Sequence, residues 1–281
     1  MLWRIGEERS MRFTIITPTY NQAAFIADTI ESVLNQRFKD FEYLIFDSES
    51  DDGTEEIVRS YEQKDPRIIY VREKDSGQAN AINKGLRMAK GEIVCWLNSD
   101  DFFYNRNVLT HVDRIFRAKE DVGVVVGDAW YCDKEKNLTE YNESDRKVPD
   151  WVLGRWYYIV QPSVFWKNMG RLLDESYHYA FDWKFFAAMF GDEKVYYSHK
   201  PYSVYRMYED NKTGQDNAKR RYEIYRLMKE RDDSRANTVW CYFVYRVYDA
   251  AEKKNKPQWK KGIDFCTRVL FHVSGKRIAG F

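Results

Sequence analysis

Short apolar runs alternate with helical periodicity through the first half of the chain. Four runs are predicted to form buried strands: Phe13–Thr17, Phe41–Asp47, Arg67–Arg72 and Glu92–Leu97. Segments with apolar residues at helical spacing follow them: Ala24–Asn35, Thr54–Gln63, Ser76–Ala89 and Asn107–Lys119. A fifth strand is predicted at Val122–Val126. This alternation is typical of βα units, which build a parallel sheet with helices packed against it.

The second half of the chain has a different pattern. Residues 127–215 are rich in aromatic residues and show weaker periodicity, whereas residues 216–281 are predicted to be helical. Pro257 is well placed to begin a last helix. Its apolar stripe is expected to consist of Trp259, Ile263, Cys266, Leu270 and Val273.

Polar residues gather directly after each of the first four predicted strands. They lie in the segments Thr17–Gln22, Asp47–Asp52, Asp75–Gln78 and Asn98–Asp101. In open α/β sheets, ligands bind outside the carboxyl ends of the strands. The sequence therefore predicts a binding site at this edge of the sheet, to which four distant segments contribute.

These segments offer carboxylates and amides instead of a glycine-rich phosphate loop. No Gly-x-Gly-x-x-Gly follows the first strand, and no Gly-x₄-Gly-Lys-Ser/Thr occurs, which argues against a dinucleotide fold and a P-loop. Carboxylates bind phosphate through a divalent cation, and they accept hydrogen bonds from ribose hydroxyls and base N–H groups. The expected cofactor is a divalent metal, Mg²⁺ or Mn²⁺.

Composition narrows the class of protein. Lys and Arg total 45 against 44 Asp and Glu, so the net charge of +1 gives no indication of a nucleic-acid partner. Aromatic residues reach 17%, and we expect most of them in the core with a few stacking on sugar. The four cysteines are far apart in the sequence, which favours a reducing compartment. Neither a secretory signal within Met1–Met11 nor an apolar run long enough to span a membrane is visible.

Four motifs in order are more specific than any one of them. They read Thr17-Pro-Thr-Tyr-Asn-Gln22, Ile45-Phe-Asp-Ser-Glu-Ser-Asp-Asp-Gly-Thr54, Glu73-Lys-Asp-Ser-Gly77 with Ala81-Ile-Asn-Lys-Gly85, and Gly91-Glu-Ile-Val-Cys-Trp-Leu-Asn-Ser-Asp-Asp101. Their order and spacing resemble those of family 2 glycosyltransferases with the GT-A fold. A looser resemblance continues through Gln161–Trp166, Phe181–Trp183 and Tyr205–Asp210, and it fades after residue 215.

The resemblance implies a nucleotide-sugar site on the first hundred residues. Its expected members are Thr17, Pro18, Tyr20, Asp47, Asp75, Lys84, Asn98 and Ser99. Asp47 would accept the base N–H, and Asp100 would be the metal ligand. Asn98 stands where the family usually has the first Asp of its Asp-x-Asp motif. An amide accepts hydrogen bonds but brings no charge, so this departure bears on metal affinity.

The resemblance also implies the catalytic group. Asp182 falls where the family has its base, which would take the proton of the attacking acceptor hydroxyl. Trp183 beside it and Gln161 would lie on the acceptor or sugar side. The family often has a metal-binding His after its late Arg, where this chain has Met207 and Tyr208. His199 is the candidate substitute.

Simpler interpretations stand beside these. Asp47, Asp51 and Asp52 are also suited to cap the helix that begins near Thr54, and Asp100 and Asp101 are suited, as a pair, to cap the helix that begins near Asn107. His199 is equally suited to a surface turn. The segment 253–277 holds eight basic residues and one acid. With Trp259 it suits either an anionic membrane surface or a solvated helix face.

Two other classes of protein are weighed against a transferase. A sugar nucleotidyltransferase also uses a Rossmann-like sheet and carboxylate-bound Mg²⁺, but Thr17–Gln22 has no Gly, Lys or Arg to hold a triphosphate. A catalytically inactive GT-A-fold binding protein is suggested by Asn98 and Tyr208.

We therefore expect an α/β protein of the GT-A fold, with a Rossmann-like, mostly parallel sheet flanked by helices. Residues 1–215 would form the catalytic domain, with a nucleotide-sugar half at about 11–127 and an acceptor half at about 128–215. Residues 216–281 would form a helical extension. The expected activity is inverting transfer from a nucleotide sugar to a glycan or lipid-linked acceptor in surface polysaccharide biosynthesis. The expected location is cytoplasmic, with peripheral contact to the inner membrane face through 253–277 as one option.

Overall fold

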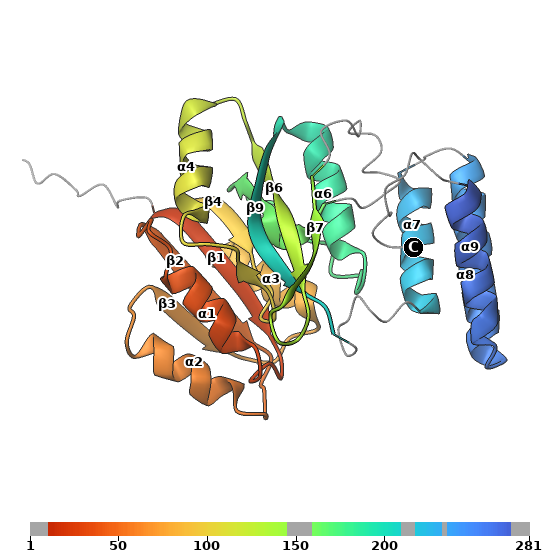
Figure 1. The fold of residues 1–281 in the computed structure, drawn as a ribbon, viewed down its shortest axis with the longest axis horizontal. Coiled ribbons are helices and arrows are strands. Elements are labelled where there is room, and N and C mark those ends of the chain that lie inside the picture. The colour runs from red at the N-terminus through yellow and green to blue at the C-terminus, as the bar shows by residue number, and fades with distance from the viewer. Residues whose placement is uncertain (1–10, 145–158, 209–216, 232–234, 271–281) are drawn as a thin grey trace, which may run out of the picture.

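The fold is a mixed sheet with helices packed on it and a helical group at one end (Figure 1). The computed structural model describes residues 11–144, 159–208, 217–231 and 235–270. The described strands are β1 Met11–Thr19, β2 Phe41–Asp47, β3 Ile68–Arg72, β4 Gly91–Trp96, β5 Phe102–Phe103, β6 Val124–Cys132, β7 Leu138–Asn142, β8 Val164–Lys167 and β9 Val195–Arg206. The described helices are α1 Ile26–Leu34, α2 Thr54–Glu62, α3 Gln78–Met88, α4 Val108–Ala118, η1 Gln161–Ser163, α6 Phe181–Asp192, α7 Ala218–Glu230, α8 Arg235–Lys253 and α9 Pro257–Leu270.

The first four long strands are parallel neighbours, as their sequence pattern predicts. β1 pairs in parallel with β2 and β4, and β2 pairs in parallel with β3. Every residue of β2 is buried, because both faces of the sheet are covered. The carboxyl ends of β1, β2, β3 and β4 therefore share one edge, and the predicted polar segments begin there.

The rest of the sheet is mixed. The strand order is β3-β2-β1-β4-β8-β6-β9-β5, and β7 pairs with β6 beside this path. The predicted strand at Val122–Val126 is the first part of β6. It does not lie next to β4, because β8 runs antiparallel between them. β9 returns in parallel with β6 and ends at Arg206.

Much of the aromatic content packs α6 against the sheet, as expected. Trp96 at the end of β4 lies 5.7 Å from Phe185 and 5.2 Å from Phe186 between ring centroids. Trp166 on β8 contacts both phenylalanines at 5.6 and 5.8 Å. Such pairs add about 0.5–1.5 kcal/mol each beyond the burial of their area. This cluster holds the first half of α6 beside the end of β4.

Helices α7, α8 and α9 lie side by side beyond α6 (Figure 1), with a small core of their own. Ile263 of the expected stripe is buried there, whereas Trp259 and Cys266 are exposed, so only part of the stripe packs inward. The side chain of Leu270, the whole of Val273 and the last basic residues of 253–277 lie outside the described residues. Within the described part of the chain, every helix is too short or too polar to cross a bilayer.

Candidate active site

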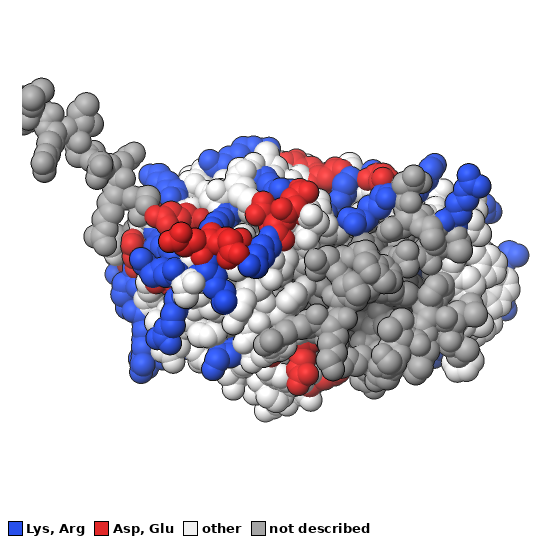
Figure 2. Space-filling model, turned by 90° about the horizontal axis from the view of Figure 1, so that it is seen from above, with Lys and Arg blue, Asp and Glu red and all other residues white. Residues whose placement is uncertain are grey.

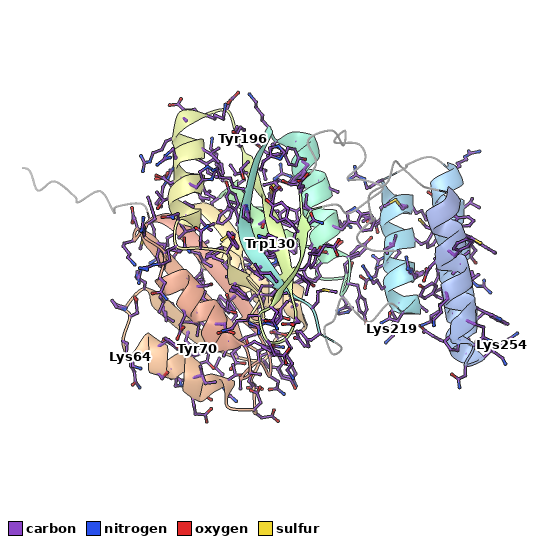
Figure 3. All side chains as sticks on the ribbon, in the orientation of Figure 1. Lys64, Tyr70, Trp130, Tyr196, Lys219 and Lys254 are labelled. Carbon is purple, nitrogen blue, oxygen red and sulfur yellow. The ribbon has the colours of Figure 1, made fainter. Side chains whose placement is uncertain are left out.

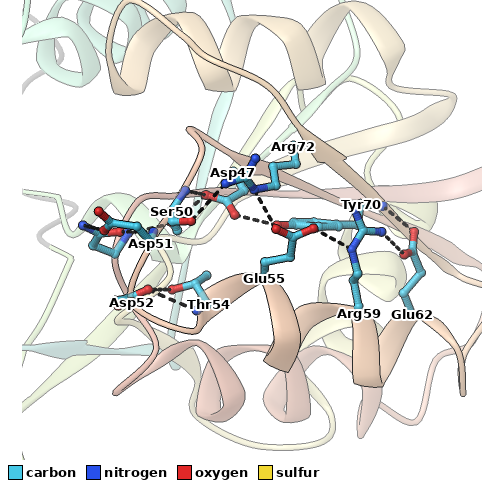
Figure 4. Close-up of polar contacts among 11 residues, drawn as sticks. Asp47, Ser50, Asp51, Asp52, Thr54, Glu55, Arg59, Glu62, Tyr70 and Arg72 are labelled. Carbon is cyan, nitrogen blue, oxygen red and sulfur yellow. Dashed lines mark hydrogen bonds and ion pairs between the residues drawn. The ribbon is translucent and has the colours of Figure 1, made fainter.

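The carboxylate of Asp47 is held in a fixed position at the end of β2 (Figure 4). Its Oδ1 accepts hydrogen bonds from the Ser50 amide at 3.0 Å and the Ser50 hydroxyl at 2.6 Å. Its Oδ2 accepts the phenol of Tyr70 on β3 at 2.5 Å. Burial and the neighbouring carboxylate raise the pKa of Tyr70 far above its usual range, so the phenol remains the donor.

The loops after β1 and β2 are joined by reciprocal hydrogen bonds. The Asn21 amide nitrogen donates to Asp51 at 2.9 Å, and the Asp51 main chain donates back at 3.0 Å. Asp52 accepts from the main chain of Thr54 at 3.0 Å and of Ala23 at 2.9 Å. Asp52 therefore links the loops to the first residue of α2, but it is not the N-cap of that helix as the simpler interpretation predicted, because Gly53 occupies that position. Asn21 has a φ of 51°, a left-handed conformation that asparagine tolerates.

The residues expected under the nucleotide base divide into buried and exposed members. Thr17 is fully buried, and its hydroxyl donates to the Leu97 carbonyl at 2.7 Å, which ties β1 to the end of β4. Pro18 is buried in β1 as well. Tyr20, which is 60% exposed, is available to a ligand at this rim.

Asp75 lies in the turn between β3 and α3, and Lys84 lies on α3. Asp75 accepts the Gly77 amide at 2.8 Å, and its own amide faces the Ser48 hydroxyl at 3.4 Å. Lys84 on α3 pairs with Glu73 at 2.8 Å. Gly77 has a φ of 130°, which a side chain would strain, so glycine suits this turn.

Asn98 lies in a chain of side-chain amides after β4. Gln78 donates to the Asn98 Oδ1 at 2.9 Å, and the Asn98 nitrogen donates to Asp101 at 3.2 Å and to Gln161 at 3.3 Å. Gln161 in turn donates to the main chain of Trp96 at 2.8 Å. Asn98, Gln161 and the end of β4 are thus brought together. Gln78 is an additional member of this chain.

Asp100 and Asp101 have different roles in the fold. Asp101 points inward, where it accepts the Arg206 amide at 3.0 Å, and burial followed by repulsion from Asp100 raises its pKa well above the usual range. Asp100 accepts the Tyr208 phenol at 2.9 Å. Burial raises the pKa of Asp100, and the hydrogen bond from Tyr208 opposes this rise. Ser99, directly before Asp100, is 5% exposed.

Arg206 contacts the turn that carries Asp100 from the interior of the protein. It is 2% exposed, and its Nε donates to the Asp100 carbonyl at 3.0 Å. Its other nitrogens donate to the Lys134 carbonyl at 2.7 Å and to Asp28 at 2.8 Å. The guanidinium lies 4.6 Å from the ring of Phe25. Sequence reasoning assigned no role to Arg206, and an arginine directly after an apolar strand segment was the only signal.

The side chains after β4 suit a divalent metal whose coordination is completed by a bound phosphate ligand. Among the described residues, no three His, Cys, Asp or Glu side chains converge on one point. Asp100 is therefore a single carboxylate that suits such an ion, while Asp101 is occupied internally. Mg²⁺ is usually held by one or two carboxylates together with substrate phosphates and water, and this donor set fits that arrangement.

The segment before α6 packs against the turn after β3. Glu175 accepts hydrogen bonds from Asn80 at 2.8 Å and Asn83 at 2.7 Å, both on α3. A Cβ on Gly77 would lie 3.6 Å from the Nδ1 of His178. Asp182 follows in the first turn of α6, half-buried, where its carboxylate accepts the Trp183 amide at 2.8 Å. The start of α6 therefore lies on the same side as the polar segments, and Trp183 is buried in the helix.

His199 is not brought to this site. It lies exposed on β9, seven positions before Arg206. An extended strand rises about 3.3 Å per residue, which puts roughly 20 Å between the two positions. The position after Arg206 is instead used by Tyr208, whose phenol contacts Asp100 directly.

Comparison with known proteins assigns the family. Residues 14–250 match the family described as "Glycosyl transferase family 2", and the chain belongs to this family. The match includes α7 and most of α8. The fold of its solved relatives is the GT-A fold, in agreement with the mixed α/β architecture.

Curated relatives have moderate identity. The chain is 26% identical over 221 residues to the GalNAc(5)-diNAcBac-PP-undecaprenol beta-1,3-glucosyltransferase of Campylobacter jejuni, covering 75% of this chain and 70% of the relative. It is 27% identical over 216 residues to an uncharacterized glycosyltransferase of Rickettsia typhi, covering 71% and 65%. It is 46% identical over 90 residues to the putative teichuronic acid biosynthesis glycosyltransferase TuaG of Bacillus subtilis, covering 31% and 35%. The chain thus spans less than two thirds of two of these relatives.

Solved structures support the fold. TarS residues 1–349 of S. aureus, determined in complex with UDP-GlcNAc, has a TM-score of 0.66 at 19% identity, covering 85% of this chain and 72% of that one. The mannosyltransferase PcManGT of Pyrobaculum calidifontis, in complex with GDP-Man and Mn²⁺, has a TM-score of 0.60 at 18% identity, covering 95% and 76%.

Proposed function

We propose that this chain transfers a sugar from a nucleoside diphosphate donor to a hydroxyl group of a glycan or lipid-linked acceptor, with inversion at the anomeric carbon. One observation carries the proposal. The ends of four parallel strands present fixed carboxylates and amides at one edge, and the helix that carries Asp182 begins beside this edge. The family membership supports transfer, and the fold has relatives solved with nucleotide sugars.

The donor would occupy the rim from β2 to β4. Asp47 is fixed by Ser50 and Tyr70, and its position suits recognition of the nucleoside. Asp75 and Lys84 lie next along the edge, nearer the diphosphate. Asp100 would hold a Mg²⁺ or Mn²⁺ ion, and that ion, when bound, would neutralise charge on the leaving diphosphate.

Asp182 would act as the general base. The acceptor oxygen forms a bond to the anomeric carbon while the bond from that carbon to the diphosphate oxygen breaks, and the proton of the acceptor hydroxyl passes to the Asp182 carboxylate. A positioned base contributes about 10²–10⁴-fold to such a step. Gln161 and Asn98 are hydrogen-bonded to each other at the end of β4, where a donor sugar would sit.

A lipid-linked acceptor suits the C-terminal helices. Trp259 is 41% exposed and Phe265 is 67% exposed on α9, and Lys254 and Lys256 lie at its start. Several Lys and Arg side chains lie at this end of the molecule and others at the opposite end (Figure 2), and Lys254 follows the last residue of α8 (Figure 3). Aromatic residues beside lysines favour an anionic membrane surface. We therefore place the enzyme at the cytoplasmic face of a membrane, in surface polysaccharide biosynthesis.

A ligand screen tests the donor site first. UDP-, GDP- and dTDP-sugars are added with and without Mn²⁺, and the melting temperature is measured. A ligand that prefers the folded state raises it, because binding stabilises that state by RT ln(1 + [L]/Kd). Asp100→Ala should abolish the part of the shift that depends on Mn²⁺. If no nucleotide sugar shifts the wild-type protein, the chain is not a transferase of this kind, and an inactive binding protein becomes the better description.

Turnover tests the base. Asp182→Asn should lower kcat at least about 100-fold while leaving the donor dissociation constant within twofold. Asp192→Asn is the matched control, because it changes an exposed carboxylate at the other end of α6 that pairs only on the surface with Arg171. An equal loss of donor binding and turnover in Asp182→Asn would remove the base assignment.

A further inference from the structure

A buried carboxylate on α7 binds the backbone that leads into α6. This residue, Glu223, is 7% exposed. Its Oε1 accepts the His178 amide at 2.8 Å, and its Oε2 accepts the amides of Tyr179 at 2.7 Å and Ala180 at 3.0 Å. Three consecutive main-chain N–H groups therefore converge on one carboxylate. Hydrogen bonds to an ionised acceptor are among the strongest in proteins.

The same face of α7 contacts the neighbouring residues of this segment. Arg226, one turn after Glu223, donates to the Ser176 carbonyl at 3.4 Å, and its guanidinium lies 4.4 Å from the ring of Tyr177. Glu230, a further turn on, accepts Lys184 of α6 at 2.6 Å. Positions three to four residues apart lie on one side of a helix, so α7 follows the segment along its whole length.

We propose that α7 is a positioning element of the active site and that Glu223 is the positioning residue for Asp182. This inference rests on the proposed role of Asp182 as the base. Ala180 is the N-cap of α6 and Asp182 is in its first turn. Glu223 holds the three residues before that turn in place. It therefore sets the position of the Asp182 backbone, from which the carboxylate extends. The aromatic cluster around Trp96 fixes the following turns of α6.

The position of α7 is itself set by the last two helices. Arg221, which is 2% exposed, donates to the Tyr248 phenol on α8 at 3.1 Å and to Asp264 on α9 at 3.3 Å. Tyr248 also donates to Asp264 at 2.7 Å. Residues two apart on α7 thus face opposite sides, with Arg221 toward α8 and α9 and Glu223 toward α6. The helices after residue 215 are therefore part of the catalytic unit.

Displacement of a reacting group by about 1 Å is enough to lower a rate by about 100-fold. Loosening of the segment before α6 should therefore lower kcat without a change in donor affinity, because the contacts of α7 described above are with this segment, with α6, and with α8 and α9. A helix that only stabilises the fold would lower the melting temperature and leave kcat per folded molecule unchanged.

The test compares Glu223→Gln with wild type. Glutamine has the same shape, but its amide nitrogen would face main-chain N–H groups. The substrates are UDP-GlcNAc, UDP-glucose, UDP-galactose and GDP-mannose with Mn²⁺ and water as the acceptor, and the donor hydrolysed fastest by the wild type is kept. We expect kcat to fall 10- to 100-fold and the donor dissociation constant to stay within twofold. Amide hydrogen exchange at 177–183 should become faster.

Lys229→Gln is the control on the same helix, because this side chain is exposed and has no part in the contacts described above that hold the segment. It should keep kcat within about twofold. Glu223→Asp keeps the charge but is one methylene shorter, so an intermediate kcat is expected even if Glu223→Gln does not fold. Wild-type kcat in Glu223→Asp or in folded Glu223→Gln, or equal losses in Glu223→Gln and Lys229→Gln, would overturn the inference. If Asp182→Asn keeps full turnover, the base assignment fails instead, and the exchange measurement still reports whether Glu223 orders the segment.

Discussion

Replacement of Arg206 by Met tests whether this buried cation supports the metal-binding turn. The substitution keeps an unbranched apolar stem and removes the guanidinium. Two main-chain carbonyls, those of Asp100 and Lys134, lose their donors, and Asp28 loses one of its two cationic partners. A buried acceptor without a partner costs about 1–3 kcal/mol, and loss of one partner from a buried ion pair costs about 3–5 kcal/mol in total.

Asp28 is partly exposed and keeps Lys136, so we take a value near the middle of these ranges, about 4 kcal/mol. For a chain of this size, 1 kcal/mol shifts Tm by roughly 2–3 °C, so the expected decrease is about 8–12 °C. Arg206→Lys keeps the positive charge but not the planar set of guanidinium donors, so its decrease in Tm should be about half as large. Because the carbonyl of Asp100 is released, the Mn²⁺-dependent part of donor binding should also weaken.

Urea and thermal unfolding followed by circular dichroism measure the stability, and titration of Mn²⁺ in the presence of UDP measures the site. Arg171→Met is the control, since that arginine pairs with Asp192 at the surface and should cost less than about 1 kcal/mol. If the free energies of unfolding of Arg206→Met and Arg171→Met lie within 1 kcal/mol of each other, the buried network around Arg206 does not stabilise the fold by the expected amount.

Two further predictions follow from the same geometry. Tyr208→Phe removes the hydrogen bond to Asp100 and should weaken Mn²⁺ binding in the presence of UDP about 10- to 100-fold by calorimetry, and unchanged affinity would separate the phenol from the metal site. Burial raises the pKa of Asp174, but hydrogen bonds from Lys184 and Ser176 outweigh it and lower the pKa to about 2. Its stabilisation is therefore complete above the unfolded pKa of about 4 and lost as pH falls toward 2. Asp174→Asn should flatten the stability–pH curve in that window, and a curve parallel to wild type would contradict this.

The sequence by itself determined the strands and the edge where the polar segments meet. Strand period and βα spacing depend on local apolar patterning, so β1 to β4 and their parallel order follow from it. The predicted positions of Asp47 and Asn98 at strand ends follow for the same reason. The insertion of β8 between β4 and β6 did not follow, because antiparallel pairing of a four-residue strand has no local signature.

Only the tertiary structure decided which acids are available at the rim. Asp100 and Asp101 are neighbours in sequence, yet one contacts Tyr208 at the rim while the other accepts the main chain of Arg206 in the interior. Glu223 looks like any acid on a polar helix until α7 packs beside the residues before α6. Burial and partners depend on contacts between residues far apart in the chain, and periodicity along the chain carries no information about them.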